Sequence, residues 1–122
     1  MTIPMVRALR GAITCDHDTP EEIGDAAREV VRAMLERNSL TSSDVISILF
    51  TTTPDLTSGF PATAVRLDGF EEVPLMGAAE IPVASALPRV IRVMMHAYSS
   101  APRSEIRHVY LRGAVVLRSD LD

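Results

Sequence analysis

Arginines in apolar or small-residue surroundings are the residues of this 122-residue sequence best placed to do chemistry. Residues 90–95 are typical of a buried β-strand with no polar face, yet Arg92 lies among them. A guanidinium keeps its proton in proteins, so a desolvated Arg92 needs an anion nearby. The anion is either a carboxylate of the chain, favoured at about two to one on this stretch alone, or a bound ligand.

Other polar residues occupy similar apolar or small-residue settings. Each alone is more typical of a surface or packing residue, and Arg66 also complements the end of a short helix. Together they predict a pocket for a small polycarboxylate, in which Glu80 accepts a hydrogen bond from a hydroxyl group. The candidates are Arg10, Arg66, Arg92, Arg118, Glu80 and Tyr110.

The sequence offers little support for other kinds of site. His17, His96 and His108 are dispersed, and Cys15 has no partner at ligand spacing, so no metal site is expected. The glycines are scattered and form no phosphate loop, and no nucleophile-elbow motif is present. Cys15 could act as a nucleophile, but a lone cysteine after a strand is more often inert, at about five to one.

Composition limits the class of protein. The net charge of −4, from 16 acidic residues and 12 arginines, argues against a nucleic-acid partner. No apolar run approaches the roughly 18 residues of a membrane helix, and no signal peptide is evident. The single cysteine cannot form an internal disulfide, which favours a cytoplasmic protein. We expect one domain over residues 1–122.

The elements that must position the candidates predict an α+β domain with a mixed sheet, one long helix and one or two short ones. Thr19 and Pro20 are typical of a helix start, and the apolar spacing continues to near Asn38. Pro61 opens a short helix that ends at Asp68-Gly69. Strands are expected at residues 5–14, 45–53, 73–76, 89–98 and 109–117, the last interrupted at Arg112-Gly113.

A series of motifs along nearly the whole chain resembles the monofunctional Bacillus-type chorismate mutases. Their order and spacing are similar to those of the family, which is far more specific than any single motif. The motifs are Arg10-Gly11-Ala12, Thr53-Pro54-Asp55-Leu56, Phe60-Pro61-Ala62, Ile91-Arg92-Val93-Met94-Met95, Ile106-Arg107-His108-Val109-Tyr110-Leu111 and Val116-Leu117-Arg118.

The resemblance implies an isomerase that rearranges chorismate to prephenate, on the route to phenylalanine and tyrosine, without a cofactor or metal. It also implies a homotrimer, shaped like a barrel, with a site at each subunit interface. By resemblance Arg92, Glu80 and Arg10 are catalytic. The implied substrate-binding residues are Arg66, Tyr110, Arg118, Phe60, Ala62, Leu75, Met76, Gly77 and Leu117.

The sequence departs from the family pattern at two positions, and two alternative functions stay open. Thr63 stands where the family often has a lysine, and Gly77 replaces a cysteine. The alternatives are a trimer that binds the anion without turnover, and a structural domain whose arginines pair with its own carboxylates. The enzyme requires Arg92 and Glu80 to share a cleft with Arg10, with their charges unpaired when the site is empty.

Overall fold

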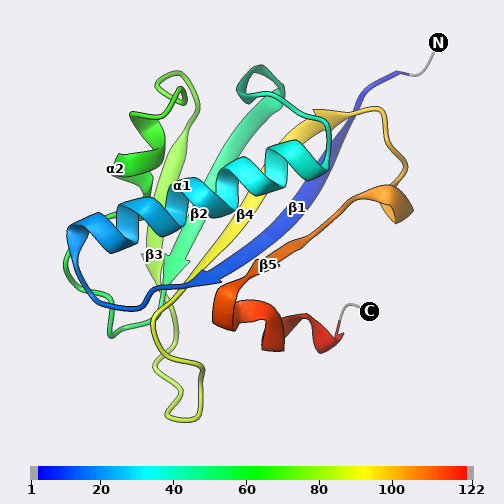
Figure 1. Cartoon of the computed structure of the whole chain (residues 1–122). Helices are drawn as coiled ribbons and strands as arrows, with labels where there is room; N and C mark the ends of the chain where they lie inside the picture. The colour runs from blue at the N-terminus through cyan, green and yellow to red at the C-terminus, as the bar shows by residue number, and fades with distance from the viewer. Residues whose placement is uncertain (1–2, 121–122) are drawn as a thin grey trace.

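Five strands form one mixed sheet in the order β3-β2-β4-β1-β5 in the computed structural model, which describes residues 3–120 (Figure 1). β4 is antiparallel to both β1 and β2, whereas β5 is parallel to β1 and β3 is parallel to β2. The elements are β1 (Met5–Thr14), α1 (Pro20–Arg37), β2 (Val45–Thr52), α2 (Pro61–Arg66), β3 (Leu75–Ala79), β4 (Val90–Ser99) and β5 (Val109–Leu111), with 3₁₀ segments η1 (Ser42–Asp44), η2 (Arg103–Glu105) and η3 (Arg112–Asp120).

Helix α1 begins and ends where the sequence places its caps. The Thr19 hydroxyl accepts a 3.1 Å hydrogen bond from the Glu22 amide, and Pro20 occupies the first helical position. At the other end, the Asn38 side chain donates to the carbonyl of Met34 at 2.8 Å. The same side chain exchanges two hydrogen bonds with the Arg107 backbone, at 2.8 and 2.9 Å, and so ties the helix end to the segment before β5.

The main core lies between α1 and one face of the sheet. Helical spacing places the apolar stripe of α1 against the apolar residues of β1, β2 and β4. Gly11 marks the closest approach, because a Cβ at this position would lie 2.5 Å from the Met34 sulfur. The largest fully buried side chains are Phe50, Leu9, Ile13, Ile23, Met34, Ile48, Ile91, Met95, Val30, Val31, Val65 and Val90.

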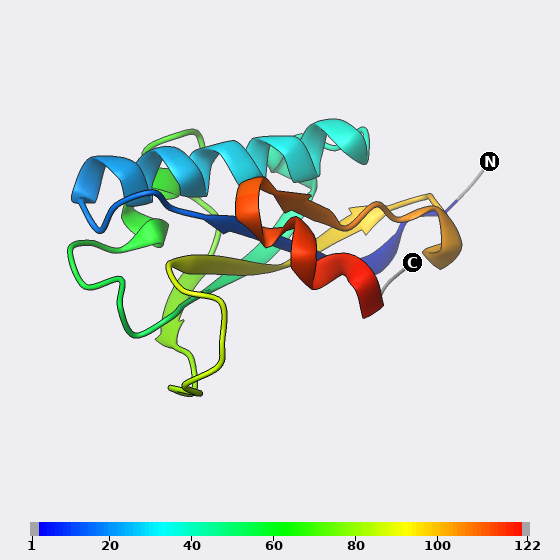
Figure 2. The ribbon, with the colours of Figure 1, turned by 60° about the horizontal axis from the view of Figure 1, so that its bottom comes forward.

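Within residues 3–120, the opposite face of the sheet is covered only in part, by η3, whose Ala114 packs against Ala12 and Val90. Figure 2 shows α1 and α2 on one side, while the loop between β3 and β4 extends away from them on the other. Large apolar side chains remain exposed on this face, among them Val6, Leu49, Met76 and Tyr98. Large apolar side chains left exposed on a sheet face are typical of a surface that a partner covers.

The predicted α+β class is confirmed, but the prediction that residues 114–117 form a strand is wrong. They belong to η3, which follows β5 directly. Arg112 adopts a positive φ of 52°, and this turn directs the chain out of the sheet. Ala114 is then buried against Ala12 and Val90, where it forms a small second core. None of the helices within residues 3–120 is long and apolar enough to cross a membrane.

Candidate active site

Three neighbouring strands present polar side chains on the face away from α1. In β4, the residues on either side of Arg92 are buried on the α1 face, so Arg92 itself points to the opposite face. The register places Thr51 of β2 beside Arg92, and Ala12 of β1 on its other side. Arg10 lies two residues before Ala12 and therefore shares this face.

These side chains meet in a cavity of about 270 Å³, which we call the sheet cavity. It brings together four of the predicted site residues, from β1, β4, β5 and η3. Among residues 3–118, whose side chains are described, no carboxylate forms an ion pair with the Arg10 guanidinium, so its charge is available to a ligand. The lining residues are Arg10, Gly11, Ala12, Leu49, Thr51, Arg92, Val93, Met94, Tyr110 and Leu117.

Glu80 joins this site from the end of β3. Its Oε2 lies 3.2 Å from the Nε of Arg92 and accepts a 2.7 Å hydrogen bond from the Thr51 hydroxyl. The Glu80 amide also donates to the Thr52 carbonyl at 2.9 Å, which fixes the backbone. The contacts that the structure gives this carboxylate involve Oε2, which leaves Oε1 able to accept a hydrogen bond from a ligand.

Two expectations about Arg92 are wrong. Its side chain is 47% exposed rather than desolvated, because β4 is covered by α1 on one face only. Its charge is paired with Glu80, a carboxylate of the chain as the strand alone favoured, whereas the enzyme alternative required both charges to be unpaired in the empty site. A partly exposed ion pair contributes only about 0–1 kcal/mol to stability, so the fold gains little from placing these charges here.

A second group of predicted site residues lines a separate cavity of about 530 Å³, the edge cavity, between α2 and β3. The loop before α2 is held by Asp18, whose carboxylate accepts hydrogen bonds from the amides of Thr57 and Ser58 and from the Thr57 hydroxyl. These bonds lower the pKa of Asp18. The predicted residues in the edge cavity are Phe60, Ala62, Leu75, Met76 and Gly77.

The remaining two predicted arginines lie outside both cavities. Arg66 is the last residue of α2 and is exposed. Arg118 lines a third cavity of about 350 Å³, the arginine cavity, together with Arg37, Arg107, His108 and Tyr110. Tyr110 therefore lines both the sheet cavity and the arginine cavity. One copy of the chain thus distributes the predicted residues over distinct places and does not gather them all.

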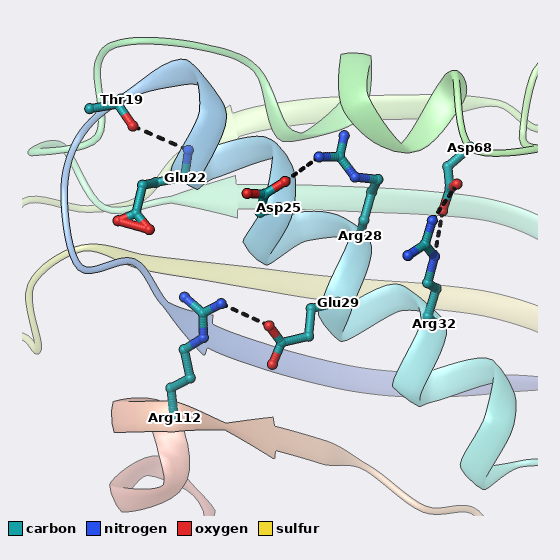
Figure 3. A network of polar contacts seen from close by, with 8 residues as sticks. All are labelled: Thr19, Glu22, Asp25, Arg28, Glu29, Arg32, Asp68 and Arg112. Atoms are coloured by element: carbon teal, nitrogen blue, oxygen red, sulfur yellow. Dashed lines mark hydrogen bonds and ion pairs between the residues drawn. The ribbon is translucent and has the colours of Figure 1, made fainter.

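The segment that carries Leu117 and Arg118 is anchored where it begins. Arg112 pairs with Glu29 of α1 at 2.7 Å and donates to the Thr14 carbonyl at 3.3 Å. The amide of the next residue, Gly113, donates to the Thr14 hydroxyl at 2.9 Å. Figure 3 shows the Arg112–Glu29 pair beside two further pairs of α1, Arg28 with Asp25 and Arg32 with Asp68.

Cys15 does not have the character of a nucleophile. It lies at the end of β1, and only 2% of its surface is exposed. Burial is the largest influence on this thiol and raises its pKa to about 11. A thiol that stays protonated at neutral pH is a poor nucleophile, so the inert alternative holds.

His108 connects the arginine cavity to the backbone of Arg10. Its Nδ1 accepts a 2.9 Å hydrogen bond from the Arg10 amide, which places the ring proton of the neutral form on Nε2. Partial burial and the Arg10 guanidinium lower the pKa of His108, so the neutral ring prevails at pH 7.

Comparisons with known proteins identify the class of enzyme. The sequence matches the chorismate mutase type I family over residues 6–121. The chain therefore belongs to the chorismate mutase type I family, which confirms both the resemblance and the predicted enzyme class, an isomerase with chorismate mutase activity.

Individual relatives agree over almost the full chain. Chorismate mutase AroH of Thermus thermophilus is 51% identical over 119 residues, covering 97% of this chain and 98% of the relative. The AroH protein of Bacillus subtilis (strain 168) is 43% identical over 118 residues, covering 96% and 93%. A solved structure of chorismate mutase from Clostridium thermocellum superimposes with a TM-score of 0.88 at 43% identity, over 90% of this chain and 98% of that chain.

One polar residue of the site was missed from the sequence. Thr51 donates to Glu80 and lies beside Arg92, yet the sequence predicted only a strand at residues 45–53 and no role for this side chain. The signal was the two-residue alternation in β2, where Ile48 and Phe50 are buried and Leu49 and Thr51 face the other side.

Proposed function

We propose that this chain converts chorismate to prephenate in the sheet cavity, with Arg92 as the principal catalytic group. The observation that carries the proposal is a fixed guanidinium facing a cavity that also holds Arg10, beside a carboxylate with a free oxygen. This arrangement fits a pericyclic rearrangement, in which a carbon–oxygen bond breaks as a carbon–carbon bond forms and no enzyme nucleophile or base takes part.

Arg92 is suited to stabilise the charge that develops on the ether oxygen of the substrate. Its ion pair with Glu80 uses Nε, which orients the guanidinium and leaves its terminal Nη groups to donate hydrogen bonds. A donor that is already in place stabilises a transition state without reorganisation. Arg10 and Tyr110 bind the side-chain carboxylate, and the free Oε1 of Glu80 accepts the hydrogen bond of the ring hydroxyl.

The remainder of the proposed site comes from a second copy of the chain. We propose a homotrimer, a barrel in which the edge cavity of one copy faces the sheet cavity of its neighbour. Two observations support it: the exposed apolar side chains on the face away from α1, and the division of the predicted residues between separate cavities. Phe60, Ala62, Leu75, Met76, Gly77 and Leu117 then enclose the substrate, while Arg66 and Arg118 bind its ring carboxylate at the mouth.

Loss of chorismate absorbance in the ultraviolet tests the activity directly. The purified chain should consume chorismate and produce prephenate with no added cofactor. Arg10→Gln should lower kcat/KM strongly, whereas Arg103→Gln, which removes an equal charge outside the three cavities, should leave it unchanged. Binding of chorismate without turnover would contradict the proposed function and favour a binding protein.

Mixing two inactive variants tests whether each site is shared between copies. Arg10→Ala impairs the sheet-cavity half, and a Phe60→Ala/Arg66→Ala double variant impairs the other half. Random refolding of equal amounts into trimers should restore about a quarter of the sites, because each working site then needs one intact half from each of two adjacent copies. No recovery in mixed trimers, confirmed by mass, would show that the site lies within one chain.

A cytoplasmic location is also part of this proposal. It is supported by the single cysteine, Cys15, which is free and buried.

A further inference from the structure

Arg37 and Arg107 bring positive charge to the arginine cavity. Arg37 lies in the last turn of α1, where its positive charge interacts favourably with the negative end of the helix dipole. Arg107 has no such explanation, because its backbone alone is held by Asn38. Within residues 3–118, whose side chains the structure describes, neither guanidinium has a carboxylate partner, although the chain is acidic overall.

The composition of the cavity wall fits an anion. No carboxylate of a described residue lines it, and each lining residue can donate a hydrogen bond. The neutral His108 ring contributes its Nε2 proton, because Nδ1 is engaged with the Arg10 amide. Guanidinium groups bind carboxylates with two parallel hydrogen bonds, so two arginines at one cavity suit a small dicarboxylate.

The arginine cavity also adjoins the proposed catalytic site. Tyr110 lines both cavities, and His108 contacts the backbone of Arg10, which lines the sheet cavity. An anion bound by Arg37 and Arg107 would therefore lie next to the sheet cavity, separated from it by Tyr110 and His108. Both arginines are exposed, which suits brief capture of a ligand from solution better than tight retention.

We infer that the arginine cavity is an outer anion site, in which Arg37 and Arg107 hold a carboxylate of the incoming substrate before it passes Tyr110. The inference rests on the proposed function for the identity of the substrate. The site itself does not depend on turnover, so its occupation can be tested with an unreactive carboxylate. Electrostatic capture accelerates association and is weakened by salt, whereas the chemical step is not affected in this way.

Titration of the ¹⁵N-arginine-labelled protein with malate tests binding without turnover. The Nε signals of Arg37 and Arg107, assigned with Arg37→Gln and Arg107→Gln, should shift together and saturate, and each variant should weaken the response of the other arginine. Movement of the Arg10 and Arg92 signals alone would overturn the outer site. This result stands whether or not the chain turns over chorismate.

Steady-state kinetics test the role in capture. The Arg37→Gln/Arg107→Gln double variant should lose about fivefold in kcat/KM at low ionic strength, and the loss should disappear at high salt, while kcat changes less than twofold. The double variant Arg37→Gln/Arg103→Gln is the matched control. It also removes two positive charges, but only one of them belongs to the arginine cavity. Equal kcat/KM for both doubles would overturn the capture role, whereas an inactive wild type would refute the proposed function instead.

Discussion

The Nε of Arg92 lies 3.2 Å from Oε2 of Glu80, which joins the middle strand of the sheet to the residue that follows its edge strand. The two residues are twelve positions apart in sequence, and the exposed loop between β3 and β4 separates them. The pair fixes the direction of the guanidinium before a ligand arrives. Preorganisation of this kind is the property that the proposed mechanism requires of Arg92.

Replacement of Arg92 by citrulline, which keeps the shape but removes the charge, should lower kcat by about 100- to 1,000-fold or more. The reason is that the neutral side chain cannot stabilise the charge that grows on the ether oxygen. Stopped or continuous ultraviolet assays of chorismate consumption measure kcat, and thermal unfolding checks that the fold is retained. A turnover number close to that of the wild type would remove the electrostatic role of Arg92.

Thr51→Val should lower kcat/KM by about tenfold, because a hydrogen bond to a charged group contributes about 1.5–3 kcal/mol and Arg92 still holds the carboxylate. The substitution removes the 2.7 Å bond to Glu80 and preserves the side-chain shape. Ser47→Ala, on the same strand and outside the cavities, is the control. Equal effects of the two substitutions would mean that Thr51 does not position Glu80.

Local signals predicted the elements that end in clear caps. Thr19 and Pro20 marked the start of α1, and Pro61 marked the start of α2, since both positions satisfy specific backbone requirements. The apolar run at residues 114–117 gave no such signal. A short apolar segment fits a strand or a buried helical turn equally well, and the contact of Gly113 with Thr14 that decides between them is distant in sequence.

The site could be predicted only in part for a similar physical reason. Arg92 lies in an apolar strand. Apolar composition predicts that a strand is buried, but it does not predict which element of this chain or of a partner covers each face. In one copy of the chain α1 covers one face of β4 and η3 covers only the Val90 end of the other, so Arg92 remains partly exposed. The separation of Phe60 from Arg10 likewise depends on tertiary geometry that no motif spacing contains.

Arg112 should tolerate glycine better than alanine. Its φ of 52° strains any residue that has a Cβ, and glycine removes that strain, whereas both substitutions remove the ion pair with Glu29. We expect the free energy of unfolding of Arg112→Gly, measured by urea denaturation, to be about 1 kcal/mol higher than that of Arg112→Ala. Equal stabilities would show that the turn into η3 relaxes when the arginine is removed.

Cys15 should make the protein less stable as the pH rises above 9. Its pKa is raised from 9.0 to about 11 by burial, so above pH 9 the unfolded chain releases a proton that the folded chain retains. The stability contributed by the protonated thiol is therefore complete below pH 9 and is lost progressively up to about pH 11. The total loss is on the order of 3 kcal/mol, at about 1.4 kcal/mol for each pKa unit.

Urea denaturation of the wild type and of Cys15→Ala between pH 8 and 11 isolates this contribution, because the two proteins differ only at the thiol. The difference in unfolding free energy should shift in favour of Cys15→Ala as the pH rises. A thiol reagent at pH 8 provides a second measurement: the native thiol should react far more slowly than the thiol in urea, since it is both buried and protonated. Rapid labelling of the native protein would show instead that the end of β1 opens readily and that the thiolate is accessible.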